Sequence, residues 1–110
     1  MADLKLIYTT WPDSEAAQGI ASAMLERRLI ACANIFSAGK SVYRWKGEIR
    51  SEDETVMILK TGRQTIEAAT AYLERHHPYD TACIIVLEND AAHTSSAFAN
   101  WVNAEVIGPP

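Results

Sequence analysis

Long apolar runs, an excess of positive charge and closely spaced cysteines are all missing from this sequence of 110 residues. No apolar run approaches the ~20 residues that a membrane-spanning helix needs, so we expect no membrane partner. Ten lysines and arginines stand against 14 aspartates and glutamates. The resulting net charge of −4 has the wrong sign for a surface that must gather a phosphate backbone, so we expect no nucleic-acid partner either.

The only two cysteines, Cys32 and Cys83, lie far apart and form no CxxC pair. They therefore predict neither a zinc knuckle nor a thioredoxin-like redox motif. Cys32 belongs to the apolar segment 30–35, where a cysteine is typically a small buried side chain, and the surroundings of Cys83 favour the same interpretation. Because nothing near the start resembles a secretion signal, we expect a cytoplasmic protein with both thiols reduced.

Common catalytic motifs are also missing. The sequence has no Ser-His-Asp order with a nucleophile turn, no HExxH, no P-loop and no GxGxxG. The aromatic strand signature of RNA-binding ferredoxin-like domains is absent as well. We therefore expect a protein that is not an enzyme.

What is present is the length and composition of one domain, 1–110, with 48% apolar and 22% charged residues. Hydrophobic spacing and turn residues divide it into alternating elements. In order, they are a strand over 4–10, a helix capped by Asp13 or Ser14 and ending near 28, a strand over 30–45 interrupted at 37–40, a turn at 46–47, a strand over 48–59, a helix from about 66 to 77, a strand over 82–87, a helix capped by Thr94 or Ser95, and a loose tail over 108–110.

The order strand, helix, strand, strand, helix, strand predicts a ferredoxin-like α+β sandwich, with both helices on one face of the sheet and the first strand near its centre. Strands 30–45 and 48–59 form an extended β-hairpin, and a C-terminal helix follows the common fold. Helical spacing places Ala17, Ile20, Ala21, Met24 and Leu25 on one face of the first helix, and Phe98, Trp101 and Val102 on one face of the last. In the second helix the predicted inward face consists of Ile66, Ala69, Leu73 and His76.

Functional side chains are densest in the run His76-His77-Pro78-Tyr79-Asp80. Successive residues on a helix point about 100° apart, so the two histidines do not face one another. Pro78 disfavours the helical conformation for His77, which leaves His77 free to meet ligands from elsewhere while His76 stays on the helix. A metal role of His77 competes with a simpler role, in which a helix-terminal histidine hydrogen-bonds nearby carbonyls.

Other side chains extend the set of candidates. Cys32 could supply a thiolate that, together with imidazole, favours copper or zinc over magnesium or calcium. The aromatic residues Tyr43, Trp45 and Tyr79 are typical of a binding surface or a subunit contact. Lys60, at a strand end, could form a polar pocket with Asp80 and Glu54.

Five stretches together resemble the CutA family: 31–35 (ACANI), 41–47 (SVYRWKG), 59–61 (LKT), 77–80 (HPYD) and Trp101. The resemblance implies a ferredoxin-like protomer that forms a homotrimer related to the PII nitrogen-signalling proteins. It also implies a role in tolerance to divalent cations, copper above all. Metal binding in bacterial members is linked to the paired histidines, here His76 and His77, and to a cysteine in the first strand. This chain departs from that pattern, because its first strand ends in Tyr8-Thr9-Thr10.

Three functional hypotheses follow. The first is a non-catalytic trimeric protein that responds to metal ions and binds copper, or a similar ion such as zinc, near His77. The second is a PII-like sensor that holds a small metabolite or an anion in clefts between subunits, lined by Tyr43, Trp45, Lys60, His77, Tyr79 and Asp80. The third is a structural trimer whose surface recruits a protein partner.

Overall fold

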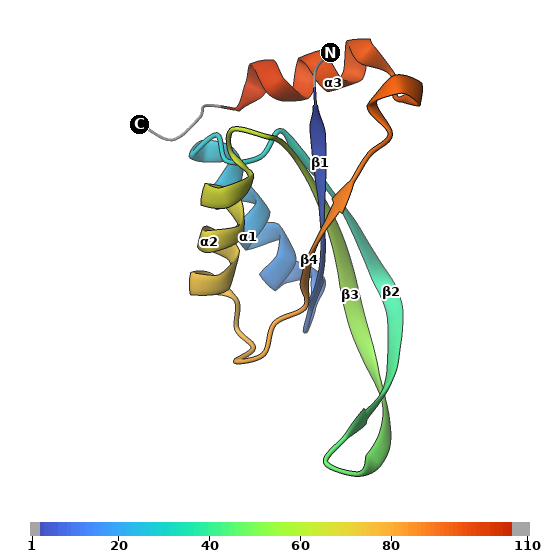
Figure 1. The fold of residues 1–110 in the computed structure, drawn as a ribbon. Coiled ribbons are helices and arrows are strands. Elements are labelled where there is room, and N and C mark those ends of the chain that lie inside the picture. Colours follow the sequence, from blue (N-terminus) through green and yellow to red (C-terminus); the bar gives the residue numbers. More distant parts are fainter. Residues whose placement is uncertain (1–2, 107–110) are drawn as a thin grey trace.

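The computed structural model describes residues 3–106 of the chain, and Figure 1 shows their fold. The elements are β1 (Leu4–Trp11), α1 (Ser14–Glu26), β2 (Cys32–Trp45), β3 (Glu48–Gly62), α2 (Ile66–His76), β4 (Ile84–Glu88), a short 3-10 helix η1 (Ala91–His93) and α3 (Ser96–Glu105). The predicted order of strands and helices is confirmed. The tail predicted over 108–110 lies outside the described residues.

The four strands form one antiparallel sheet in the order β2-β3-β1-β4. The first strand is therefore central, as predicted. Helices α1 and α2 lie side by side on one face of the sheet, and α3 lies across one of its ends (Figure 1). The ferredoxin-like α+β sandwich expected from the element order is confirmed.

The core lies between the sheet and the helices α1 and α2. Alternate residues of β1 and β3 point into it, because successive side chains on a strand point to opposite faces. Trp11 is fully buried, and its indole N–H donates a hydrogen bond of 2.7 Å to Thr9 Oγ1. The buried cluster consists of Ile7, Trp11, Ala17, Ala21, Met24, Ile30, Met57, Leu59, Ala69 and Leu73.

The opposite face of the sheet carries apolar side chains that no helix of the described chain covers. Strand alternation and register place them there, since Phe36 pairs with Val56, Tyr8 with Ile85 and Leu6 with Leu87. We call this surface the open sheet face, and it comprises Leu6, Tyr8, Phe36, Val56, Ile58, Ile85 and Leu87. Three of these side chains are about half exposed, namely Phe36 at 54%, Ile85 at 50% and Leu87 at 42%.

The hairpin of β2 and β3 extends beyond the other strands. The pairing of β1 with β3 ends at Thr55, so residues 39–54 pair only with each other and project from the body (Figure 1). We call these residues the hairpin arm. The interruption predicted at 37–40 is a register shift between Phe36 and Gly39, through which β2 continues. The tip turns at Lys46 and Gly47, where φ is 50° and 82°, as the sequence predicted.

The predicted caps are confirmed, since Asp13 caps α1 and Ser95 caps α3. The apolar faces predicted for α1 and α3 are buried only in part. Leu25, Phe98 and Trp101 belong to those faces but are exposed. Each precedes or follows a buried residue by one position, which turns its side chain about 100° away from the buried stripe. In α3 the buried positions are Val102 and the small Ala99, which fit against the end of the sheet.

Candidate functional site

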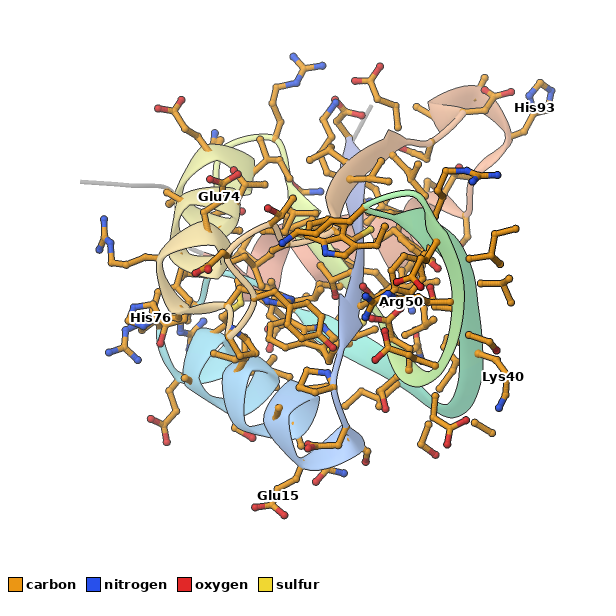
Figure 2. All side chains as sticks on the ribbon, turned by 90° about the horizontal axis from the view of Figure 1, so that it is seen from below. Glu15, Lys40, Arg50, Glu74, His76 and His93 are labelled. Carbon is orange, nitrogen blue, oxygen red and sulfur yellow. The ribbon has the colours of Figure 1, made fainter. Side chains whose placement is uncertain are left out.

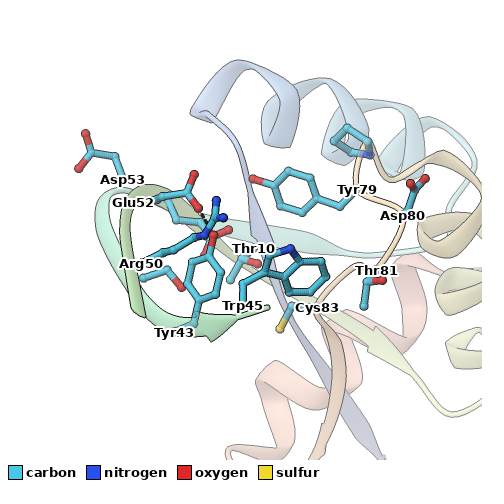
Figure 3. Close-up of a pocket in the computed structure, with 13 residues that line it drawn as sticks. Thr10, Tyr43, Trp45, Arg50, Glu52, Asp53, Tyr79, Asp80, Thr81 and Cys83 are labelled. Atoms are coloured by element: carbon cyan, nitrogen blue, oxygen red, sulfur yellow. Dashed lines mark hydrogen bonds between the residues drawn. The ribbon is translucent and has the colours of Figure 1, made fainter. Parts of the chain in front are cut away.

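A cleft of about 780 Å³ lies between the hairpin arm and the loop that joins α2 to β4 (Figure 3). We call it the arm cleft. It is lined by Thr10, Ser41, Tyr43, Trp45, Arg50, Glu52, Asp53, Glu54, Pro78, Tyr79, Asp80, Thr81 and Cys83. Tyr43, Trp45, Tyr79 and Asp80 were predicted to line a ligand cleft between subunits. The structure brings all four to this cleft of a single chain, and a cleft between subunits stays a prediction.

One wall of the arm cleft is a single face of the hairpin arm. The register places Tyr43 opposite Arg50 and Ser41 opposite Glu52, so these four side chains and Trp45 share one face. The Tyr43 hydroxyl donates a hydrogen bond to the Glu52 carboxylate, which joins the two strands across the cleft wall (Figure 3). The turn at the tip sets the register of the two strands, and the register therefore determines which side chains of the arm line the cleft.

The other wall is the loop that follows His77. His77 ends α2 with an extended backbone, φ −68° and ψ 137°, as its position before Pro78 predicted. The Tyr79 N–H donates to His77 Nδ1 at 3.1 Å, and His77 Nε2 lies 2.8 Å from the Thr10 carbonyl oxygen. Since Nδ1 accepts a hydrogen bond, Nε2 carries the ring proton, and this N–H donates a hydrogen bond to the Thr10 carbonyl oxygen.

The environment of His77 favours the neutral ring. Only 9% of its surface is exposed, and the ring stacks on Trp11 with centroids 4.1 Å apart. Burial lowers the pKa of His77, and this effect is larger than the opposite effects of the Thr10 carbonyl and the charge of Glu54, which raise the pKa. The pKa of Tyr79 is raised by burial and by the nearby carboxylates of Glu54 and Glu52, so its phenol stays protonated.

His76 does not occupy the inward position that the helical spacing predicted. It is exposed and points outward from α2, as Figure 2 shows, with its ring 4.2 Å from the ring of Tyr72. The inward position at this end of α2 belongs to Leu73, and the next buried side chain is His77. The ring of His76 therefore lies in solvent, whereas the ring of His77 is surrounded by protein.

Cys32 lies apart from the histidines. It pairs with Lys60, which pairs with Leu6, four residues before the Thr10 carbonyl that contacts His77. Four residues of a strand span about 13 Å, so the structure does not bring the thiol to the imidazole. Within residues 3–106, no group of three or more His, Cys, Asp or Glu side chains is arranged to hold a metal ion. The predicted set of His77, His76 and Cys32 is therefore not assembled within one chain.

Lys60 also lies outside the arm cleft. Its ammonium group donates to Asn34 and lies 5.6 Å from the centre of the Phe98 ring. Cys83, which was interpreted only as a small buried residue, lines the cleft instead. Both cysteines are only partly buried, which differs from the buried positions that the sequence predicted, and they are not joined to one another in the described chain.

The lining of the arm cleft combines negative charge with aromatic rings. Four carboxylates, those of Glu52, Asp53, Glu54 and Asp80, stand against one guanidinium, that of Arg50. Lys40 neutralises part of this charge through an ion pair of 2.8 Å with Asp53 at the rim. A cleft with this balance attracts cations. The hairpin register, which follows from the turn at 46–47, was the sequence signal that could have placed Arg50 opposite Tyr43 and Glu52 on the same face of the hairpin.

The fold and the site define a class of protein: a ferredoxin-like α+β protomer with a long hairpin arm and an acidic cleft beside it. Comparison with known proteins gives the family. A sequence model described as CutA1 divalent ion tolerance protein matches residues 5–105. The chain belongs to this family, and the resemblance inferred from the five stretches is confirmed.

Individual relatives agree along nearly the whole chain. The Divalent-cation tolerance protein CutA of Escherichia coli O139:H28 is 35% identical over 101 residues, which cover 92% of this chain and 88% of the relative. The protein of the same name from Pectobacterium atrosepticum is 32% identical over 106 residues, with 96% and 94% covered. A crystal structure of CutA1 from Ehrlichia chaffeensis superposes with a TM-score of 0.88 at 42% identity and covers 96% of both chains. Across residues 3–106, no helix is both long and apolar enough to cross a membrane.

Proposed function

We propose that this protein acts in tolerance to divalent cations as a non-enzymatic cytoplasmic homotrimer, and that it binds copper or zinc in the arm cleft. The observation that carries the proposal is the acidic lining of the cleft, to which Glu52, Glu54, Asp80 and Cys83 contribute. These side chains do not form a ligand cluster within residues 3–106 of one chain, so the site needs ligands from a neighbouring subunit. Oxygen and sulfur ligands together favour zinc or copper over magnesium or calcium. The cleft is preferred to His77 because both ring nitrogens of His77 already form hydrogen bonds.

The open sheet face supports the homotrimer. A continuous apolar surface of this kind marks an interaction site on a soluble protein, and closed rings of identical subunits are a common way to cover one. Thr10 of β1 also lines the arm cleft, so the cleft borders the open sheet face. A neighbouring subunit on that face would therefore stand where it can add ligands to a set that is incomplete in one chain.

Sedimentation equilibrium tests the assembly. Ile85→Asp places a carboxylate on the open sheet face and is expected to convert the trimer to monomers, because burying an unpaired charge in an apolar interface is costly. Leu25→Asp is the matched control, since Leu25 has a similar exposure of 43% on α1, away from that face. A monomeric wild-type protein at micromolar concentration, or a trimer that survives Ile85→Asp, would contradict the proposed assembly.

Titration calorimetry with copper and zinc salts tests the site. Replacing cleft carboxylates by amides, as in Glu52→Gln and Asp80→Asn, keeps the shape and removes the charge. We expect at least about a tenfold loss of affinity for each, which corresponds to ~1.4 kcal/mol. Glu74→Gln, on the outer side of α2 (Figure 2), is the control and should bind like wild type. Unchanged affinity in both cleft variants would contradict the proposal that the cation binds in this cleft.

A second candidate function is a sensor of a small organic ligand. The cleft volume of about 780 Å³ is typical of small-molecule sites and exceeds what a single ion needs. The rings of Tyr43, Trp45 and Tyr79 offer faces for stacking, and the acidic lining favours a cationic or neutral molecule over an anion. Thermal unfolding with matched panels of cationic, neutral and anionic metabolites tests this function. Stabilisation by the cationic or the neutral panel, but not by the anionic one, would support it. Absence of any shift would contradict it and favour the structural trimer.

A further inference from the structure

His77 connects three parts of the chain that are separate in sequence. It ends α2, its Nε2 donates to the carbonyl oxygen of Thr10 at the end of β1, and its Nδ1 accepts the N–H of Tyr79 in the following loop. Thr10 and Tyr79 both line the arm cleft, whereas His77 does not. The imidazole therefore joins two walls of the cleft from behind.

Packing fixes the ring as firmly as the two hydrogen bonds do. The imidazole lies between the indole of Trp11, at 4.1 Å between ring centres, and the phenol of Tyr79, at 5.1 Å. Trp11 is itself fully buried and bonded to Thr9, so it cannot move aside without disturbing the core. A ring held in this way has one tautomer and one orientation.

A metal ion would have to replace one of these two hydrogen bonds. At Nδ1 it would leave the Tyr79 N–H without its acceptor, and at Nε2 it would leave the Thr10 carbonyl without its donor. Both groups belong to the cleft wall, so ligation by His77 would disturb the site it is meant to serve. Unsatisfied partly buried backbone groups are costly, which favours the arrangement seen here.

We infer that His77 is a positioning residue, which holds the loop 78–83 against the end of β1 and so fixes Tyr79 and the residues after it in the cleft wall. It is not itself a ligand. The inference rests on the proposed function only where it takes the arm cleft as the binding site. The hydrogen bonds that define the role exist in the free protein, so part of the test needs no bound cation.

Substitution at His77 separates positioning from ligation. In His77→Asn the side-chain carbonyl oxygen can accept the Tyr79 N–H in place of Nδ1, while in His77→Ala nothing can. We expect His77→Ala to weaken zinc binding by about tenfold or more, as loss of supporting residues around a metal site typically does, and His77→Asn to restore most of the affinity. If His77 were a ligand, the two variants would lose affinity equally, because an amide replaces an imidazole poorly on zinc.

Nitrogen-15 NMR of the wild-type protein provides a measurement that does not depend on whether the variants fold. Without zinc, we expect the His77 ring in the Nε2–H tautomer and a Tyr79 amide that is protected from exchange with water. With saturating zinc, we expect the same tautomer. A different tautomer or an unprotected Tyr79 amide in the free protein would overturn the inference, and so would coordination of a ring nitrogen. If zinc does not bind at all, the cleft proposal fails while the free-protein spectra still test His77.

Discussion

The helix-covered half of the sheet and the hairpin arm use the same two strands in opposite ways. In the covered half, alternate residues of β3 such as Met57 and Leu59 are fully buried under the helices. In the arm the strands have only each other, and Val42 and Ile49 on its outer face are 69% and 71% exposed. A two-stranded ribbon with this exposure has little stability of its own.

The difference indicates where stability and function are located. The covered half supplies the free energy of folding through apolar burial, at roughly 1.5–3 kcal/mol for each large side chain. The arm depends on the covered half and on its own backbone hydrogen bonds, which leaves its side chains available for the cleft on one face and, in the proposed trimer, for a neighbouring subunit. Substitutions should therefore affect folding in the covered half and binding or assembly in the arm.

Two tryptophans provide the largest expected contrast. Trp11→Ala should reduce the free energy of unfolding by about 3–5 kcal/mol, because it leaves a cavity in the core and removes the surface on which His77 stacks. Trp45→Ala, in the arm, should reduce it much less, since that side chain is 47% exposed. Urea unfolding at several protein concentrations separates subunit dissociation from unfolding of the protomer. Equal losses in the two variants would show that the arm contributes to folding as the core does.

The register shift at the base of the arm gives the next effect. A Cβ on Gly39 would lie 2.5 Å from the backbone oxygen of Glu54, so Gly39→Ala forces the two strands apart. We expect a loss of roughly 1–3 kcal/mol from this overpacking and a weaker affinity of the cleft, because Glu54 lies on its wall. Urea unfolding and titration calorimetry measure the two effects. Unchanged stability would mean that the base of the arm adapts freely.

The fold was predictable because its strands and helices follow simple rules. Residue type alone gave Asp13 or Ser14 and Thr94 or Ser95 as candidate caps, of which Asp13 and Ser95 cap the helices, and the glycine at 47 predicted the turn at Lys46 and Gly47. Phe98 and Trp101 lie on one side of α3, as the spacing predicted, with ring centres 5.8 Å apart, but both are exposed. Helical spacing gives the width of an apolar stripe but not which part of it meets the sheet. Their exposure depends on tertiary packing, which a local sequence pattern does not predict.

The site was predictable only in part. Tyr43 and Trp45 were found as aromatic residues on a hairpin, and Pro78 correctly predicted that His77 leaves the helix. The direction in which His77 then points depends on Trp11, which lies in another element and was not singled out. Within one chain Lys60 lies away from the arm cleft, because its position at a strand end does not say which end of the sheet holds the cleft. Its place in a cleft between subunits stays a prediction.

Acid should affect the junction that His77 forms before it affects the arm. The folded protein lowers the pKa of His77 from 6.5, chiefly by burial, so the unfolded chain binds the proton more readily. His77 therefore stabilises the fold at neutral pH, and this contribution is lost as the pH falls from about 6.5 through the lower folded pKa. Urea midpoints of wild type and His77→Asn at a series of pH values isolate the effect. Parallel curves between about pH 7.5 and 5.5 would contradict it.

The smallest expected effect comes from the same glycine-to-alanine change made in the covered half. Gly19 lies in the middle of α1, its Cβ position has no atom within 4 Å, and it is exposed. Gly19→Ala should stabilise the protein by about 0.5–1 kcal/mol, because alanine loses less backbone freedom than glycine when a helix forms. Cleft affinity should not change, since α1 contributes no residue to the lining. Gly39→Ala and Gly19→Ala add the same methyl group, so we expect changes of opposite sign in the free energy of unfolding measured with urea. Opposite signs would distinguish the close strand contact of the arm from the exposed helix position of the body. Two losses of equal size would contradict that distinction.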